Sequence, residues 1–321
     1  MKHPYDITPE ILRLVSSISE KIGEVKAYYL NKQSPQLRKR NRIKTIHSSL
    51  QIEGNTLTEE QITALLENKR IIGSQKDVIE VMNAIQVYKN IDSYKYYSEK
   101  SFLKAHSELM QNLIPSAGKY RNKGVGIVKG TEIEHIAPPF QNVPSLMKEL
   151  FTYLKNHKEL SLIKSCVFHY EVEFIHPFID GNGRMGRLWQ TLILMNEYPV
   201  FEFLPFEELI SQSQDEYYKA LALSDKAGNS TVFIEYMLRI IDTSLQNLLN
   251  YNNKVLKDID RLDYFLHLGI KEFNRKEYMN VFKDISSATA SRDLKKGVDL
   301  GMFERIGDLN KTRYSVRKKN S

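Results

Sequence analysis

One twelve-residue segment in the middle of the chain gathers the residue types that phosphate chemistry requires. Residues 176–187 read His-Pro-Phe-Ile-Asp-Gly-Asn-Gly-Arg-Met-Gly-Arg. His176 can accept a proton near neutral pH, and the carboxylate of Asp180 can hold Mg²⁺ through oxygen. Pro177 lacks an amide proton and ends the helix expected before it. A base and a hard carboxylate therefore stand four residues apart on one loop.

The second half of this segment has the composition of an anion site. Gly181, Asn182 and Gly183 are small, so their backbone amides can point into one concavity ahead of a helix N-terminus. Arg184 and Arg187 can bind further phosphate oxygens with two hydrogen bonds each. Each residue alone has an ordinary structural explanation, such as a turn or a helix end. Their combination predicts chemistry on the phosphates of a nucleotide.

Residues 176–187 match the signature of the Fic family, HPFx[D/E]GNGRxxR, at every position. The chain resembles this family further in His169 and Tyr170 on the preceding helix, and in the glycine-containing segment 118–139, where the family has a hairpin flap. The resemblance covers about residues 35–250. It implies a mainly helical fold and transfer of AMP from ATP to a Tyr, Thr or Ser hydroxyl of a target protein, or of the chain itself.

The resemblance also implies a role for each residue of the segment. His176 is expected to be the general base, and Asp180 is expected to hold Mg²⁺ against the α- and β-phosphates of the co-substrate ATP. Arg184 would stabilise the departing pyrophosphate, and Arg187 would bind the γ-phosphate. The residues expected to bind ATP are Gly181, Asn182, Gly183, Arg184, Gly186, Arg187, Tyr217 and Tyr218.

Two points leave alternatives open within the family. Relatives of the Doc branch bind the nucleotide reversed and transfer the γ-phosphoryl group, but they lack the second Gly-Arg pair that Gly183 and Arg184 provide here. Ser213 stands where relatives often have Asn, so the adenine contacts of Tyr217 and Tyr218 are less certain than the phosphate contacts. A tyrosine pair at this spacing is also typical of a helix core.

An upstream segment matches the inhibitory motif of the family, [S/T]xxxE[G/N], in Ser49, Glu53 and Gly54. The resemblance implies that Glu53 pairs with Arg187 and occupies the place of the γ-phosphate, so that the chain inhibits itself. In some relatives the equivalent glutamate positions water for removal of AMP, which leaves a reverse activity open.

The elements that position these residues are mainly helical by their apolar periodicity. Between residues 115 and 139 the helical periodicity gives way to glycines and short β-favouring pieces, and Gly130 with Thr131 predicts a hairpin turn. Its strand Val125, Gly126, Ile127 and Val128 is expected to dock a target segment by main-chain hydrogen bonds. Thr58 is expected to cap a helix. Helices are expected over residues 7–30, 38–51, 79–97, 102–113, 143–156 and 161–175, after Thr58, after Gly183, and onward to about Tyr251.

The last part of the chain predicts a winged helix-turn-helix domain, with helices over residues 260–272, 275–282 and 286–300 and a hairpin wing over 302–316. The expected domains are an N-terminal helical region with the inhibitory motif (1–95), a Fic core (96–252) and the winged helix with a basic tail (253–321). The candidate DNA contacts are Thr289, Arg292, Lys296 and Lys311. A protein-docking module is the alternative, and a DNA-binding regulator with a fused Fic domain is the second class of function.

Composition sets the remaining expectations. The chain has 321 residues and a net charge of +7, and residues from Lys254 onward hold 16 Lys and Arg against 10 Asp and Glu, a field that favours polyanions. The single cysteine, Cys166, lies in a helical apolar pattern and is expected to be buried. No apolar stretch predicts a membrane span or a leader, so a cytoplasmic protein is expected. A homodimer is an open alternative to a monomer.

Overall fold

The computed structural model of the protein describes residues 3–29, 35–129, 132–255, 258–268, 270–282, 285–307 and 312–316. The chain divides into two compact units, residues 1–245 and 246–321. Within the described ranges, no helix is both long and apolar enough to cross a membrane.

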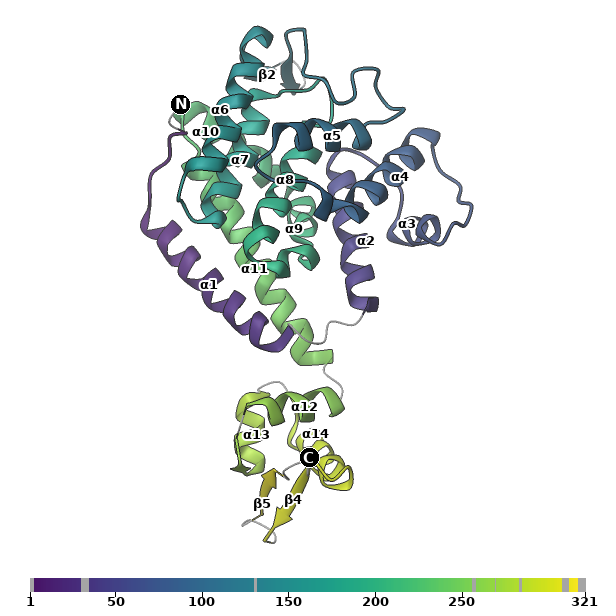
Figure 1. The fold of residues 1–321 in the computed structure, drawn as a ribbon, viewed down its shortest axis with the longest axis vertical. Helices are drawn as coiled ribbons and strands as arrows, with labels where there is room; N and C mark the ends of the chain where they lie inside the picture. Colours follow the sequence, from purple (N-terminus) through teal and green to yellow (C-terminus); the bar gives the residue numbers. More distant parts are fainter. Residues whose placement is uncertain are drawn as a thin grey trace. The chain divides into compact units, whose positions relative to one another are not determined.

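The first unit is a helical assembly with one small sheet (Figure 1). Its helices are α1 (Pro9–Tyr29), α2 (Pro35–Ile52), α3 (Glu59–Leu66), α4 (Gln75–Lys89), α5 (Glu99–Leu109), α6 (Val143–Asn156), α7 (Ser161–Ile175), α8 (Asn182–Glu197), α9 (Phe206–Gln212), α10 (Gln214–Ala227) and α11 (Thr231–Val255), the last of which continues past residue 245. Short 3₁₀ turns cover Ile91–Ser93, Phe140–Asn142 and Pro199–Phe203.

Helices α7 and α8 form the centre of this unit (Figure 1). Both are buried along almost their whole length, and Phe168 on α7 and Trp189 on α8 are fully buried. A helix that is apolar on all sides belongs in a core, where packing against several neighbours stabilises it. Cys166 is also fully buried, and burial raises the pKa of its thiol to about 12, so the expectation of a buried, unreactive cysteine is confirmed. The chemistry-bearing segment is the connection between these two central helices.

Helix α2 carries Ser49 near its C-terminus and packs against α4 and α9. It ends at Ile52, and Gly54 follows with φ +87°, a left-handed conformation that favours glycine. The hydroxyl of Thr58 accepts from the amide of Gln61, whose side chain reaches back to the Thr58 amide, so the predicted helix cap is confirmed as a capping box.

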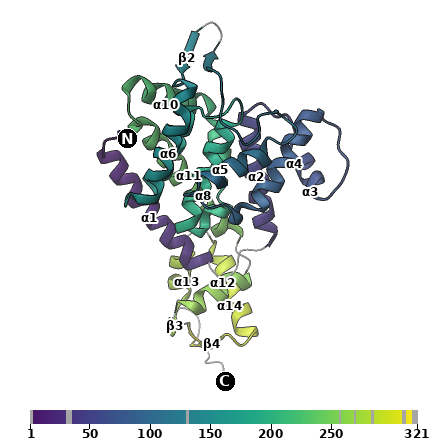
Figure 2. The same cartoon turned by 45° about the horizontal axis from the view of Figure 1, so that its top comes forward.

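The hairpin β1 (Gly126–Lys129) and β2 (Glu132–Ile136) projects from the helical unit, as Figure 2 shows from its top. The strands are antiparallel, with Gly126 opposite Ile136, and the register shifts between Ile127 and Val128. The turn residues Gly130 and Thr131 lie outside the described residues. Because each strand has one neighbour in this sheet, no described residue pairs with its outer edge.

Two expected helices in this unit are too long: the helix expected over residues 102–113 ends at Leu109, and the other is the one over residues 79–97. Residues 79–97 were expected as a single helix, whereas α4 ends at Lys89 and a 3₁₀ turn follows. After this break, the indole of Trp189 donates to the carbonyl of Tyr96 at 2.7 Å, which attaches the segment to α8. The next helix starts at Glu99 behind its cap Ser98.

The second unit consists of α12 (Asp258–His267), β3 (Glu272–Phe273), α13 (Arg275–Val281), α14 (Ser287–Asp299), β4 (Phe303–Ile306) and β5 (Arg313–Val316). The sheet order is β3-β5-β4, and both pairings are antiparallel. The helix expected over residues 260–272 is wrong in its last part. Helix α12 ends at His267, and Glu272 belongs to a strand. Phe273 is buried in the core of this unit and pairs with Tyr314, so strand pairing replaces the last helical turn.

Candidate active site

The chemistry-bearing segment begins where α7 ends. His176 caps this helix in the left-handed conformation, with φ 50° and ψ 59°, and its amide donates to the carbonyl of Val172 at 3.0 Å. Arg121 holds the turn, since its Nε donates to the His176 carbonyl at 2.7 Å and its Nη2 donates to the Ile175 carbonyl at 3.3 Å. A non-glycine residue in this conformation persists only where its surroundings fix it. The base predicted from the sequence is therefore held at a fixed place beside the loop.

The side chain of Asn182 stabilises the loop after His176 by hydrogen bonds within the loop. Asn182 is buried, accepts from the Phe178 amide at 2.9 Å and donates to the Phe178 carbonyl at 3.0 Å. Gly181 precedes α8 with φ +88° and provides no side-chain cap. The first amides of a helix lack intrahelical partners and carry the positive end of the helix dipole. The N-terminus of α8, at Asn182 and Gly183, can therefore bind an anion.

Arg184 is almost fully buried and lies between two carboxylates. Its Nη1 is 3.2 Å from Oε1 of Glu80, and its Nη2 donates to Oδ1 of Asp180 at 2.9 Å. The other oxygen of Glu80 accepts from the side-chain amide of Asn55 at 2.9 Å. Glu80 thus connects Asn55, the residue after Gly54, to Arg184 of the loop.

Arg187 is fully buried and is held by residues at the C-terminal end of α2. Its Nε donates to the hydroxyl of Ser49 at 3.1 Å, and its Nη2 donates to the Ser49 carbonyl at 2.9 Å and to Oε1 of Glu53 at 2.7 Å. Burial would lower the pKa of Arg187, but the carboxylate of Glu53 raises it above its ordinary value. The remaining nitrogen, Nη1, has no hydrogen-bond partner among the described residues. One donor of a buried guanidinium thus stays available beside the loop.

The carboxylate of Glu53 lies directly over the anion loop. A methyl group placed on Gly183 would sit 2.5 Å from Oε1 of Glu53 and 3.0 Å from Nη1 of Arg187. An anion bound by the amides of α8 and by Arg187 would meet this carboxylate, and like charges at such a distance repel. Gly54 lets the chain turn away immediately after Glu53. Ser49, Glu53 and Gly54, which the sequence pattern joined, thus act on one arginine.

A buried polar row lies behind the loop. His169 is fully buried, its Nδ1 is 2.7 Å from Oε1 of Gln190, and its Nε2 is 3.0 Å from the Tyr217 hydroxyl. The Tyr217 hydroxyl donates to Oε1 of Glu173 at 2.9 Å. Burial would raise the pKa of Glu173, but the hydrogen bond to His169 and the charges of His176 and Arg187 lower it. The carboxylate therefore stays ionised close to the base and the second arginine.

Gly186 and Tyr217, which are both expected to bind ATP, are packed closely against other residues. A methyl group on Gly186 would lie 2.5 Å from Cδ2 of His169, so this glycine lets α8 approach α7. The structure gives Gly186 this packing role, and its contact with ATP stays a prediction. Tyr217 is 1% exposed, whereas Tyr218 is 38% exposed. Ser213, at the position where relatives often have Asn, lies 3.1 Å from the Tyr236 hydroxyl.

The sequence analysis missed four polar residues that the structure brings to the site: His106, Arg121, Glu173 and Glu80. A signal exists for two of them. Glu80 shares the buried face of α4 with Ala84 and Val87, and His106 lies between Phe102 and Leu109 on the buried face of α5. A charged or polar residue at an apolar helical position needs a partner, but the sequence does not say which one.

The donor set fits one Mg²⁺ held together with a nucleotide. Asp180 keeps 45% of its side chain exposed, and Mg²⁺ commonly uses one or two carboxylates together with substrate phosphates. Within the described ranges, no group of three or more His, Cys, Asp or Glu side chains could hold a metal. The metal expected from the sequence would accordingly enter with ATP.

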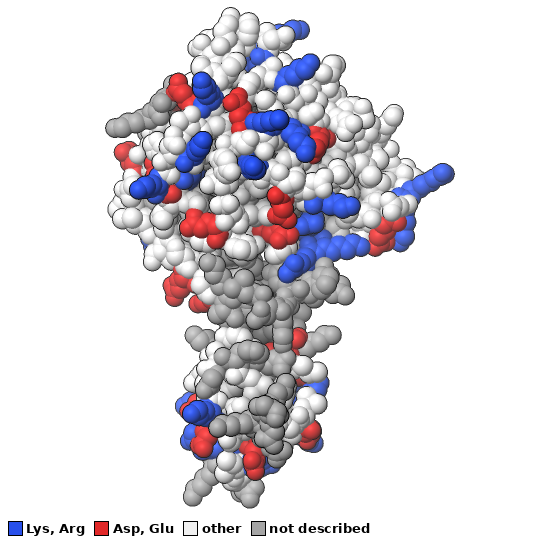
Figure 3. Space-filling view, viewed as in Figure 1, with Lys and Arg blue, Asp and Glu red and all other residues white. Residues whose placement is uncertain are grey.

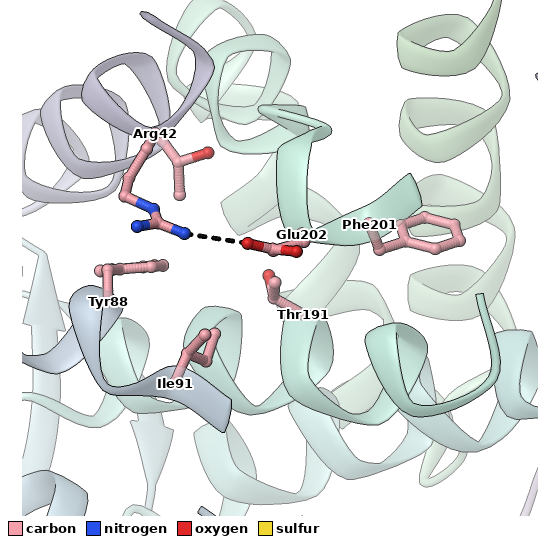
Figure 4. A pocket seen from close by; sticks show the side chains of 7 residues that line it. Arg42, Tyr88, Ile91, Thr191, Phe201 and Glu202 are labelled. Carbon is pink, nitrogen blue, oxygen red and sulfur yellow. Dashed lines mark hydrogen bonds and ion pairs between the residues drawn. The ribbon is translucent and has the colours of Figure 1, made fainter. Parts of the chain in front are cut away.

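A separate small pocket lies between α2, α4, α8 and the 3₁₀ turn Pro199–Phe203 (Figure 4). Its volume is about 10 Å³, which is room for about one water molecule and far too small for a nucleotide. In it Arg42 pairs with Glu202 at 3.0 Å, and Tyr88 and Thr191 line its other walls. No residue of segment 176–187 lines this pocket.

The candidate DNA contacts lie on α14 of the second unit, except for Lys311, which lies outside the described residues. Arg292 is exposed, and its Nη2 donates to the Thr289 hydroxyl at 3.3 Å. Lys296 pairs with Asp258 at 2.8 Å, whereas its neighbour Lys295 is exposed. Lys295 therefore accompanies Arg292 on the outer face of the helix, although the sequence analysis selected Lys296.

A model of the Fic/DOC family matches residues 96–194. A crystal structure of a Fic family protein from Desulfovibrio desulfuricans G20 is 38% identical to this chain, covers 100% of both chains and has a TM-score of 0.77. The chain belongs to the Fic family. A solved fragment of Fic-1 from C. elegans shares the fold at 21% identity, with a TM-score of 0.63 over 76% of this chain and 73% of the fragment.

Among curated proteins, this Fic protein is 27% identical to protein adenylyltransferase fic-1 of Caenorhabditis elegans over 64% of its own length and 40% of the relative. It is 25% identical to a probable protein adenylyltransferase of Aquifex aeolicus (strain VF5) over 64% of its own length and 72% of the relative. The chain thus spans less than half the length of the nematode relative.

Proposed function

We propose that this Fic protein transfers AMP from ATP to a hydroxyl group of a protein, with itself as one substrate. The observation that carries this proposal is the uncapped N-terminus of α8, which stands beside a fixed histidine and two buried arginines. The names of the curated relatives support the same chemistry. In the reaction, the hydroxyl oxygen forms a bond to the α-phosphorus of ATP, and the bond to the β-phosphate oxygen breaks to release pyrophosphate.

The residues of the chain divide this work by their chemistry. His176 takes the proton of the attacking hydroxyl, and the amides at Asn182 and Gly183 bind phosphate oxygens. Arg184 neutralises the departing pyrophosphate, and Arg187 fixes the γ-phosphate, so that the α-phosphorus faces His176. Asp180 would hold Mg²⁺, which supplies positive charge to the phosphates. The outer edge of the hairpin strand Gly126–Lys129 would align the target segment.

We further propose that Glu53 inhibits this reaction. Its carboxylate pairs with Arg187 and lies within 2.5 Å of a methyl position on Gly183, where the amides would hold phosphate. ATP could then bind in the reactive pose only after Glu53 moves away. The exposure of the Glu53 side chain, 25%, leaves room on one side for such a movement.

Parallel labelling with α-³²P-ATP and γ-³²P-ATP tests the reaction. The Glu53→Gly variant should label itself or a protein of a lysate stably from the α-label and not from the γ-label, and His176→Ala in that background should abolish this labelling while ATP still binds. Stable label from the γ-position alone would reject AMP transfer and support the phosphotransferase alternative. A Glu53→Gly variant as slow as the wild-type chain would reject inhibition by Glu53.

We propose the second unit as a winged helix, because helix, strand, two helices and an antiparallel hairpin follow one another in it. Arg292 and Lys295 lie exposed on α14 and favour an anionic partner such as DNA. A protein-docking module remains the competing proposal, and the two differ in their response to salt.

A further inference from the structure

His106 on α5 contacts the loop at the Asp180 carbonyl and has no role in the proposed reaction. It is fully buried, its Nε2 is 3.0 Å from the carbonyl of Asp180, and its Nδ1 accepts from the amide of Gly118 at 2.8 Å. Its ring stacks on that of Phe178, with ring centres 3.5 Å apart and 5° between the planes. Both ring nitrogens and one ring face are therefore engaged.

These contacts determine the tautomer of His106. A backbone amide can only donate, so Nδ1 must be the unprotonated nitrogen that accepts from Gly118. The proton of the neutral ring then lies on Nε2 and is donated to the Asp180 carbonyl. A ring whose Nδ1 accepts a hydrogen bond is neutral, so the contact with Gly118 also fixes the charge of His106. The ring thus works as a fixed donor at one end and a fixed acceptor at the other.

The peptide unit that His106 holds is the one that orients the anion loop. The Asp180 carbonyl belongs to the peptide bond before Gly181, whose φ of +88° turns the chain into α8. A methyl group on Gly181 would lie 2.9 Å from Sδ of Met110 and 3.4 Å from Nε2 of His106, so the loop lies directly against α5. Rotation of this peptide would turn the amides at the start of α8 away from an incoming phosphate.

We propose that His106 is a positioning residue, which holds the Asp180 carbonyl through Nε2 and so keeps the anion loop in its phosphate-binding conformation. The inference rests on the proposed function in so far as the phosphate belongs to ATP. His106 itself touches neither nucleotide nor target. The contact with Gly118 serves a different purpose, since it anchors α5 to the segment that leads toward the hairpin.

Two amide replacements separate the two contacts of His106. In His106→Gln, the side-chain amide can reach the place of Nε2 and donate to the Asp180 carbonyl, but the contact with Gly118 is lost. In His106→Asn, the shorter side chain can accept from Gly118 at the place of Nδ1 but cannot reach Asp180. Both variants are made in the full-length Glu53→Gly chain. The matched controls are His157→Gln and His157→Asn, at a half-exposed histidine on a different helix end.

Two readouts decide the proposal. Hydrogen exchange of the peptide that contains residues 180–183 should be about fivefold faster in His106→Asn than in His106→Gln, which is the factor expected for one net hydrogen bond. The KM for ATP in AMP transfer should rise about fivefold in His106→Asn and stay within about twofold in His106→Gln, at equal melting temperature. Neither readout should change in the two His157 variants.

Equal exchange and equal KM in the two His106 variants would overturn the proposal and make His106 a core residue only. If the Glu53→Gly parent transfers no AMP, the proposed function fails, but the exchange comparison still decides whether His106 holds the loop. The two failures are thus distinguishable.

Discussion

Both units of the protein contain a buried arginine paired with a carboxylate, and the pairs of Arg187 and Arg261 differ in how completely they are closed. In the second unit, Arg261 donates from Nε and Nη2 to the two oxygens of Asp293 at 2.6 and 2.8 Å, and Tyr278 donates to the same carboxylate at 3.2 Å. In the helical unit, Arg187 gives one donor to Glu53 at 2.7 Å. Asp293 is 1% exposed, whereas the Glu53 side chain is 25% exposed.

The difference separates a structural ion pair from an exchangeable one. A buried pair with all its donors and acceptors satisfied keeps its geometry, because loss of either partner leaves an unpaired charge in the core. A pair with a spare donor and a partly exposed carboxylate can be opened by an anion that brings more contacts. Figure 3 shows that Lys, Arg, Asp and Glu side chains intermix over the visible face of the helical unit.

The largest effect is expected at Arg187. Glu53→Gly should raise AMP transfer well above that of the wild-type chain, and Arg187→Ala in the Glu53→Gly chain should lower kcat/KM about 100-fold, because one preorganised charged contact is lost. Labelling with α-³²P-ATP over a range of ATP concentrations measures both. Arg187→Lys serves as the control that keeps the charge but loses the two-point contact with Ser49. Retention of the full Glu53→Gly activity in Arg187→Ala would show that the open pair is not the regulated one.

The second largest effect should appear in the second unit and leave catalysis alone. Arg261→Ala should destabilise this unit by about 3 to 5 kcal/mol, because Asp293 then stays buried without its partner. Limited proteolysis and hydrogen exchange of residues 258–307 would detect the unfolding. AMP transfer should stay within twofold, since His176, Glu53 and the hairpin all precede residue 245. Arg292→Ala, at an exposed position on α14, is the control that should not unfold the unit.

A third prediction uses a buried carboxylate of the helical unit to which the described residues provide no cationic hydrogen-bond partner. Glu207 is fully buried, and Thr191 donates to it at 3.4 Å. Burial raises the pKa of Glu207 from 4.5 to about 7. The unfolded chain thus loses this proton at a lower pH than the folded chain does, and the free energy of unfolding falls as pH rises from about 4.5 to about 7, by about 3 kcal/mol in total.

Glu207→Gln removes this titration and should stabilise the helical unit at pH 8 but not at pH 4.5. Urea unfolding followed by the fluorescence of Trp189, the single tryptophan of the chain, reports on this unit alone. The same difference between variant and wild type at both pH values would contradict the assignment. Thr191→Val, which removes the donor and keeps the carboxylate, should lower stability at pH 8 by about 1 kcal/mol.

The smallest effect is expected on α14. If the second unit binds DNA, Arg292→Ala should weaken binding to a preferred duplex by about 1 kcal/mol and relax sequence preference, whereas Lys311→Ala should weaken binding to all duplexes alike. Fluorescence anisotropy with genomic and random duplexes, at several salt concentrations, measures both. Absence of binding at about 50 mM salt would leave a protein-docking module. Several basic residues behind the positive balance, Lys311 and residues 317–319 among them, lie outside the described part of the chain.

Local sequence was sufficient for the elements with strong local signals. Helix α7 ends beside Pro177, the Thr58 cap holds α3, and Ser286 and Gly301 delimit α14, because proline geometry, side-chain capping and left-handed glycine act within a few residues. The strand at Glu272 and the break after Lys89 were not predictable in this way. The strand depends on pairing with Ser315, and the segment after the break is attached to Trp189 through Tyr96; both partners are more than forty residues away along the chain.

The same division holds for the candidate site. The sequence by itself determined the chemical types and their order on one loop, His176, Asp180 and two arginines, because spacing on a short loop already limits where these groups can lie. The resemblance to the family motif already implied the pair of Glu53 with Arg187. Only the tertiary structure decided that Glu80 meets Arg184 and that His106 meets the Asp180 carbonyl. These partners come from separate helices, and a buried charge or polar group takes whichever partner the packing of helices brings within hydrogen-bond distance.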